Sequence, residues 1–379
     1  MTSAHQRDHG FIWVPSTPLP HMLQLDALRA FAVLAVLIAH FTPKTSKFFL
    51  PFKVVDLGGV GIRLFFVISG FLITGILLRS KSYCEKERLP VWYEFRQFYA
   101  RRVLRIFPLF YLVLVIAALL NIQPVRQTFL WHAVYLTNFY LFLGGKGGSV
   151  SHLWSLAVEE QFYFVWPWII LLTSRRRLAV LLPVIIAAGP IFRLICGLYT
   201  ENPKTPILPL SCLDTLGVGA FLALRRDQFH QQYCRKYPFG RSGLLLGIGI
   251  FAIFVLLRAT NHGRMIGYAI FDIGVALIAG WIVWHASIGM HGFIGKLMRI
   301  KPLIYLGTIS YGIYVYHNFV HYLLDSKITK ILGLLHARSL TIPLICAITI
   351  SVAALSWQFF ERPINNLKRY FKYYRDRRV

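Results

Sequence analysis

Two side chains able to take part in chemistry, Arg29 and His40, lie eleven residues apart in the first long apolar segment. A helix turns by about 100° and rises about 1.5 Å per residue, so this spacing places both on one face, roughly 16 Å apart. That separation is about half the thickness of a bilayer core. Ionisable side chains are costly inside membrane-length helices and usually mark a functional site. The spacing therefore predicts a polar site that extends between these two residues.

A second group of cations stands at the start of another apolar segment. Arg102 and Arg105 are three residues apart, so one helix face carries both. Guanidinium groups bind phosphate in bidentate fashion, and this pair together with Arg29 suits a polyanion such as the phosphates of a nucleotide cosubstrate. Arginines at the inner ends of membrane helices are also ordinary determinants of topology, and their side chains reach the lipid headgroups. Both interpretations stay open.

The composition is that of a membrane protein. Of the 379 residues, 56% are hydrophobic and 15% are charged, whereas soluble domains have about 25% charged residues. Apolar stretches near 20 residues in length recur along the chain, which is typical of a polytopic helical membrane protein. In a soluble protein, the formal charge of +26 would favour a nucleic-acid partner. Here the positive-inside rule accounts for the charge, and we expect membrane lipid but no nucleic acid as a partner.

We expect an all-α fold with about ten transmembrane helices in one membrane domain over residues 25–363. The predicted spans are 25–42, 58–79, 103–121, 152–172, 178–198, 207–224, 242–258, 266–286, 303–324 and 341–360. If the N-terminus is cytoplasmic, 26 of the 41 Lys and Arg residues fall on the inner side, 10 on the outer side and 5 within spans. This asymmetry predicts that both termini are cytoplasmic, with a polar leader over 1–24 and a basic tail over 364–379.

One further apolar segment, 127–143, does not fit this topology. As a span, it would move Arg175, Arg176 and Arg177 to the outer side. It is short for a span and contains His132 and Asn138. The segment is therefore predicted to be a re-entrant or interfacial helix on the outer side.

The predicted topology also assigns a depth to each polar residue. An imidazole and several carboxylates share the outer half of the membrane, namely His40, Glu159, Glu160, Asp214 and Asp272, together with Arg193 and His317. Because lipid cannot solvate such groups, they should face the protein interior or an aqueous cavity. Asp214 and Asp272 are interpreted as counter-ions of Arg193, whereas Arg29 lies near the cytoplasm.

Several of these features have a structural interpretation beside a functional one. Ser69 and Gly70 would allow a close backbone approach, either to a narrow ligand or to another helix. His317 would be either a catalytic residue or a buried hydrogen-bond partner. Glu160 and Asn138 are expected to support the site. The 5 cysteines are scattered and imply neither a disulfide framework nor a metal site.

Six sequence motifs occur in a characteristic order. They are Arg29-x10-His40, Phe65–Leu72 (FFVISGFL), Tyr99–Pro108 (YARRVLRIFP), Leu153–Tyr163 (LWSLAVEEQFY), Gly307–His317 (GTISYGIYVYH) and Phe359–Pro363 (FFERP). Together they resemble the acyltransferase-3 family of bacterial integral-membrane acyltransferases over residues 25–363. Arg63, just before the second motif, departs from many members of that family, which carry an acidic or neutral residue there.

The resemblance implies an enzyme that transfers an acyl group, most often acetyl, from cytoplasmic acyl-CoA to a hydroxyl of a cell-surface carbohydrate. It also implies functional roles for Arg29, His40, Arg102, Arg105 and Glu159. Acetyl-CoA or another acyl-CoA would be a cosubstrate, with no permanently bound cofactor, and the enzyme would lie in the bacterial cytoplasmic membrane. Some family members carry an additional hydrolase-like domain; we expect none here, so the membrane domain would itself perform the transfer.

From these expectations we form a mechanistic hypothesis. His40 acts as general base on the acceptor hydroxyl, and Glu159 orients it. Arg29, Arg102 and Arg105, with Ser69 and Gly70, line the path of the acyl-CoA. Two other functions stay open: a transporter or flippase of lipid-linked sugars, and an acyltransferase for a non-carbohydrate small molecule. The sequence leaves the acceptor, the acyl group and the oligomeric state open.

Overall fold

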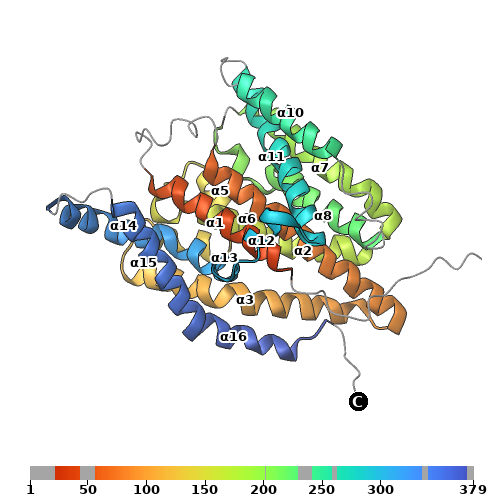
Figure 1. Ribbon diagram of the computed structural model, residues 1–379, viewed down its shortest axis with the longest axis horizontal. Coiled ribbons are helices and arrows are strands. Elements are labelled where there is room, and N and C mark those ends of the chain that lie inside the picture. Colours follow the sequence, from red (N-terminus) through yellow and green to blue (C-terminus); the bar gives the residue numbers. More distant parts are fainter. Residues whose placement is uncertain are drawn as a thin grey trace, which may run out of the picture.

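The computed structural model describes residues 22–42, 56–200, 202–228, 241–257, 263–334 and 340–373. Within these ranges the secondary structure is helical and contains no strand (Figure 1). The longer helices are α1 (Leu23–Phe41), α2 (Leu57–Glu87), α3 (Val91–Leu119), α6 (Leu153–Leu172), α7 (Arg175–Tyr199), α8 (Leu213–Gln228), α10 (Arg241–Leu257), α11 (Gly263–Ile288), α14 (Ser310–Leu334) and α15 (Thr341–Ser356). The shorter helices are α4 (Val125–Ala133), α5 (Thr137–Phe142), α12 (Gly292–Leu297), α13 (Lys301–Thr308) and α16 (Arg362–Asn366).

Among the described residues, six helical segments are long and apolar enough to cross a membrane. They are α1, α2, α3, α7, Ala269–Ile288 within α11, and Thr341–Tyr370, which contains α15 and α16. A shorter apolar helix covers Ser242–Leu257 within α10. The prediction of an all-α, multi-pass membrane fold is therefore confirmed. The expected count of about ten spans is not confirmed, because α6, α8 and α14 are not among these segments.

The centre of the molecule is formed by α1, α2 and α6 (Figure 1). Helix α2 packs against α1, α6, α8 and α11, and so it joins several parts of the described bundle. Helices α10 and α11 pack together at the upper edge of the view, and α14 and α15 pack together on its left. Helix α14 also contacts α1 and α3. The predicted site residues therefore lie on helices that pack around α2 and α14.

Local sequence signals account for the helix boundaries around α2. Asp56 caps the N-terminus of α2 by accepting a hydrogen bond from the backbone N–H of Gly59 at 3.0 Å. The helix ends at Arg88, which has a left-handed φ of 51°. Pro90, which has no N–H to lose, immediately precedes α3.

The segment 127–143 is not the single re-entrant or interfacial helix that the sequence predicts. The structure contains two short helices, α4 and α5, with a break at residues 134–136. Tyr135 adopts a left-handed φ of 56° in this break. Its carbonyl accepts a hydrogen bond from the side chain of Gln161 at 2.7 Å, which ties the break to α6. A side chain of another helix thus hydrogen-bonds to the backbone at the break, and such a contact cannot be predicted from hydropathy.

The predicted span 303–324 is also divided, into α13 and α14. Gly307, near the end of α13, lies against the backbone of Asp26 in α1, and a Cβ atom at this position would be only 1.9 Å from the Asp26 carbonyl oxygen. The close approach explains why glycine occupies this position. The chain leaves helical geometry two residues later, at Ile309, before α14 begins.

The two predicted terminal regions are only partly described. Residues 1–21 of the predicted leader and 374–379 of the predicted tail lie outside the described residues. The described part of the tail continues from α16 and is bound to α3, since Arg101 donates hydrogen bonds to the carbonyl oxygens of Lys368 and Phe371 at 3.0 and 2.9 Å. Of the leader, Gln24 already belongs to α1 and binds Met290.

Candidate active site

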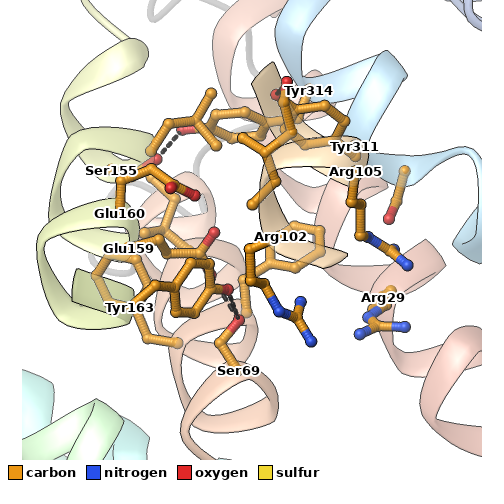
Figure 2. Close-up of a pocket in the computed structure, with 16 residues that line it drawn as sticks. Arg29, Ser69, Arg102, Arg105, Ser155, Glu159, Glu160, Tyr163, Tyr311 and Tyr314 are labelled. Carbon is orange, nitrogen blue, oxygen red and sulfur yellow. Dashed lines mark hydrogen bonds between the residues drawn. The ribbon is translucent and has the colours of Figure 1, made fainter. Parts of the chain in front are cut away.

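A pocket between α1, α2, α3, α6 and α14 brings together most of the predicted site residues (Figure 2). We call it the arginine pocket. Its lining consists of Arg29, Ile62, Phe65, Phe66, Ser69, Arg102, Arg105, Ile106, Ser155, Leu156, Glu159, Glu160, Tyr163, Ser310, Tyr311 and Tyr314. Three cations and two carboxylates thus meet in a space that is otherwise mostly aromatic and aliphatic.

The cationic side of the arginine pocket comes from α1 and α3. Figure 2 shows Arg29, Arg102 and Arg105 gathered on the side away from α6. Arg29 forms a salt bridge with Asp26 at 2.9 Å. The Arg102 guanidinium lies 5.5 Å from the ring centroid of Tyr163, and its Nε atom is buried without a hydrogen-bond partner. Within the described residues, neither Arg102 nor Arg105 forms a salt bridge, so both guanidinium groups are available to an anionic ligand.

The acidic side of the arginine pocket comes from α6. Glu159 accepts a hydrogen bond from the Ser69 hydroxyl at 2.6 Å, and that hydroxyl in turn accepts one from Tyr163 at 3.2 Å. The glutamate also lies within electrostatic range of Arg29, Arg102 and Arg105. Glu160 lines the same pocket. One helical turn of α6 therefore faces the arginines with carboxylate and phenol groups.

His40 lies in a different place. It lines a second hollow, together with Leu141, Gly147, Gly148, Ser151, His152, Trp154, Lys204 and Ile207. We call this the His40 hollow. The imidazole is exposed at the end of α1 and its Nδ1 atom lies 2.9 Å from Nε2 of His317. The structure thus gives His40 and Glu159 different partners, His317 and Ser69, whereas the sequence-based hypothesis pairs them with each other.

Tyr314 connects the two spaces. Its hydroxyl lies 2.5 Å from the Ser155 hydroxyl in the arginine pocket and donates to the His152 carbonyl oxygen at 2.9 Å. Its own carbonyl oxygen lies 2.6 Å from Nδ1 of His317. The His152 ring packs against the His317 ring, with centroids 4.7 Å apart. The arginine pocket and the His40 hollow are therefore separated by a single layer of hydrogen-bonded side chains.

Sequence reasoning did not select Ser155, Tyr163, His152 or Tyr314. Ser155 and Tyr163 lie on α6 with Glu159, His152 immediately precedes α6, and Tyr314 lies on α14 with His317. Helical spacing could have indicated two of them. Ser155 is four residues from Glu159 and Tyr314 is three residues from His317, so each shares a helix face with a predicted site residue. Only the packing of α6 against α14 shows which of these neighbours enter the site.

Two of the predicted site residues have structural roles. Gly70 does not line the arginine pocket; it faces α8, where a Cβ atom would lie 2.0 Å from the Leu216 carbonyl oxygen. The sequence left open whether Ser69 and Gly70 approach a ligand or another helix. Gly70 contacts another helix, whereas Ser69 lines the arginine pocket. Asn138 pairs with Gln161 through two hydrogen bonds of 3.1 Å and thereby holds α5 against α6.

A buried charge network lies beside the site. Arg193 contacts Asp214 at 2.6 Å and Asp272 at 3.5 Å, which confirms both aspartates as its counter-ions. Arg63 binds the two carboxylate oxygens of Asp272 at 2.8 and 3.0 Å. The guanidinium of Arg63 also lies 5.7 Å from the Trp154 ring centroid. The arginine that departs from the family pattern therefore has a defined partner in this chain.

The apolar helices and the polar pocket among them define a multi-pass membrane protein with a pocket inside its helical bundle. The chain belongs to the acyltransferase-3 family: a family model described as an acyltransferase domain matches residues 22–361.

Several curated proteins are similar to this chain. Peptidoglycan O-acetyltransferase OatA of Listeria monocytogenes is 26% identical, over 93% of this chain and 57% of the relative. Putative peptidoglycan O-acetyltransferase YrhL of Bacillus subtilis is 30% identical, over 90% of this chain and 54% of the relative. A putative O-acetyltransferase of Staphylococcus aureus is 28% identical, over 90% and 57%. The chain spans a little over half the length of these relatives, and no solved structure is significantly similar to it.

Proposed function

We propose that this protein is a membrane O-acyltransferase that moves an acyl group, most simply acetyl, from acyl-CoA to a hydroxyl of a cell-surface or lipid-linked carbohydrate. The family supports the acyl transfer. The names of the relatives support an acetyl group and a carbohydrate acceptor. The observation that carries the proposal is the pair of guanidinium groups, on Arg102 and Arg105, that face the arginine pocket without a salt bridge in the described part of the chain.

The donor belongs in the arginine pocket. Arg102, Arg105 and Arg29 lie close enough to repel one another, because Arg105 interacts electrostatically with both of the others. Lys368 is a further basic residue within electrostatic range of Arg102 and Arg105. Phosphate groups of CoA would relieve this repulsion and accept bidentate hydrogen bonds. Ser69 and Glu159, on the opposite side, would hold the polar pantetheine arm; this role for Glu159 replaces the pairing with His40 that the sequence suggested.

We propose ten spans, with both termini in the cytoplasm and the protein in the bacterial cytoplasmic membrane. The distribution of 41 Lys and Arg residues along the chain supports this orientation. In this orientation the arginine pocket lies toward the cytoplasm, where acyl-CoA is made, and the His40 hollow lies toward the outside. A pantetheine arm would then deliver the acyl group across the layer formed by Ser155 and Tyr314.

The acceptor belongs in the His40 hollow. His40 takes the proton of the acceptor hydroxyl while its oxygen attacks the thioester carbonyl carbon. The carbon–sulfur bond then breaks, and the CoA thiolate recovers the proton, so that ester and free CoA are the products. The exposed imidazole and the neighbouring Trp154 ring, on which a sugar could stack, support this assignment.

The proposal is tested on the purified protein in detergent, where both ends of the site are accessible. Acetyl-CoA labelled in the acetyl group and chitotetraose, a soluble carbohydrate, serve as substrates, and labelled ester and free CoA are measured. We expect the wild-type protein to form both, and His40→Ala to reduce the rate at least about 100-fold. His285→Ala, a histidine of α11 outside both spaces, is the matched control. Transfer by His40→Ala at the wild-type rate would refute the assignment of the base.

A further inference from the structure

His317 is completely buried, at 0% exposure, and both of its ring nitrogens are engaged. Nδ1 lies 2.6 Å from the carbonyl oxygen of Tyr314, and Nε2 lies 2.9 Å from Nδ1 of His40. The ring also packs beside the rings of Phe41, His152 and Tyr314. In the described part of the chain, no carboxylate forms a salt bridge with His317. An imidazolium in these surroundings would be an unpaired buried charge, so the ring is neutral.

The identity of the two partners fixes where the single proton of His317 lies. A carbonyl oxygen can only accept a hydrogen bond, so Nδ1 of His317 must carry the proton. Nε2 of a neutral ring then has a lone pair and can only accept. The hydrogen on the 2.9 Å contact between the two histidines must therefore come from Nδ1 of His40. A neutral His40 with its proton on Nδ1 has an unprotonated Nε2.

We propose that His317 is a positioning residue for acyl transfer, which holds His40 with Nδ1 protonated and Nε2 free to accept the proton of the acceptor hydroxyl. This inference rests on the proposed function, in which His40 is the base. The inference identifies Nε2 as the nitrogen of His40 that reacts. The residue that fixes this choice, His317, lines neither the arginine pocket nor the His40 hollow. In histidines generally, the hydrogen bond made by one ring nitrogen determines whether the other ring nitrogen carries a proton.

The proton balance of the reaction agrees with this arrangement. When Nε2 of His40 takes the acceptor proton, the ring becomes an imidazolium that still donates from Nδ1 to His317. The acceptor oxygen forms its bond to the acyl carbon and the carbon–sulfur bond breaks. Nε2 then returns the proton to the CoA thiolate, and His40 is again neutral. His317 remains neutral throughout and neither gains nor loses a proton.

Other polar groups surround His40. The Asn318 side chain hydrogen-bonds to His40, and its amide Nδ2 donates to Ser151 at 3.3 Å and to Nδ1 of His152 at 3.1 Å. His152 donates from Nε2 to the Val315 carbonyl oxygen at 3.2 Å, so this imidazole is also held in one tautomer. The titratable groups that interact with His40 from its surroundings include Asp56, His321, His152 and His317.

The direct test is nitrogen NMR of the purified protein labelled with 15N-histidine, at a pH where the imidazoles are neutral. The His40 signals are assigned by their loss in His40→Ala. We expect wild-type His40 to carry its proton on Nδ1. A proton on Nε2 of wild-type His40 would overturn the inference, and this measurement requires no folded His317 variant.

Two variants of His317 extend the test to catalysis. His317→Gln retains a side-chain oxygen that can accept from Nδ1 of His40, whereas His317→Leu retains no acceptor. Fixing the wrong tautomer in serine proteases costs about 10⁴ in kcat. We expect His317→Leu to lower kcat at least about 100-fold with an unchanged KM for acetyl-CoA, and His317→Gln to recover most of the loss.

The outcomes separate this inference from the proposed function. If His40→Ala is inactive and His317→Leu keeps the wild-type kcat, His40 is the base but His317 does not position it. If His40→Ala is itself fully active, the proposed base is wrong. If His317→Gln and His317→Leu lose activity equally although both unfold at the wild-type temperature, acceptance of the His40 proton is not the function of His317.

Discussion

The guanidinium of Arg63 binds both carboxylate oxygens of Asp272, at 2.8 and 3.0 Å, and so joins α2 to α11 inside the apolar body of the protein. Asp272 also contacts Arg193, which contacts Asp214, so the network links α2, α7, α8 and α11. All four side chains are buried. Buried charges are tolerated only when they are paired, and here two arginines are matched by two aspartates. Arg63 also lies over the Trp154 ring, at the edge of the His40 hollow.

Removal of one member of this network should destabilise the protein strongly. We expect Arg63→Leu to lower the free energy of unfolding by about 3–5 kcal/mol, because Asp272 loses its bidentate partner. The double variant Arg63→Leu/Asp272→Leu should recover much of this loss, since Arg193 keeps Asp214. Thermal unfolding in detergent measures both changes. Equal destabilisation by the single and the double variant would contradict the explanation by an unpaired charge.

Acyl-CoA binding should depend on the shape of the Arg102 side chain as well as on its charge. Lysine keeps the charge but loses the planar pair of donors, so we expect Arg102→Lys to weaken CoA binding about tenfold. The neighbouring Arg101 provides a matched control, because its guanidinium donates to backbone carbonyl oxygens and does not line the arginine pocket. Isothermal titration with CoA should give Arg101→Lys a Kd within about twofold of wild type. A similar loss in both variants would indicate a general effect of charge.

The contact between α2 and α8 should not tolerate a methyl group at Gly70. A Cβ atom there would lie 2.0 Å from the Leu216 carbonyl oxygen, so the helices must separate. We expect Gly70→Ala to destabilise the protein by about 1–3 kcal/mol. Gly249 in α10 has no atom within 4 Å of the corresponding position, and Gly249→Ala should be neutral or slightly stabilising. Comparison of their unfolding temperatures checks this prediction, which fails if the two variants behave alike.

His132 in α4, outside the membrane-spanning segments, should make stability depend on pH. Burial lowers the pKa of His132 to about 4, from an ordinary value of 6.5. Its Nε2 atom donates to the Thr128 hydroxyl, which itself donates to the Pro124 carbonyl oxygen, and its Nδ1 atom accepts from Thr137. Between pH 6.5 and 4 the unfolded chain binds a proton that the folded chain does not, so this contribution to stability is lost as the pH falls.

The variant His132→Gln keeps one donor and one acceptor but does not titrate. As the pH falls from 7 to 4, we expect the wild-type protein to lose up to about 3 kcal/mol more of its free energy of unfolding than His132→Gln does. Urea unfolding at several pH values measures the shift. A difference that stays constant with pH would show that His132 is not held neutral by the fold.

The sequence was sufficient for those features that depend on short-range pattern. Hydropathy predicts the apolar helices, because a membrane helix satisfies its own backbone hydrogen bonds. Helical spacing places Arg102 and Arg105 on one face, and both do line the same pocket. The breaks at Tyr135 and Ile309 were not predictable in this way, because contacts with Gln161 and with Asp26 accompany them.

By itself, the sequence determined which residue types enter the membrane, on which helices, and in which order. Only the tertiary structure decided their partners. His40 meets His317 across 277 residues of chain and Arg63 meets Asp272 across 209, while Glu159 binds Ser69 and not His40. Helix periodicity sets the face on which a side chain lies, but the rotation and depth of each helix against its neighbours determine what that face meets. Those quantities arise from the packing of all the helices together, and no local pattern contains them.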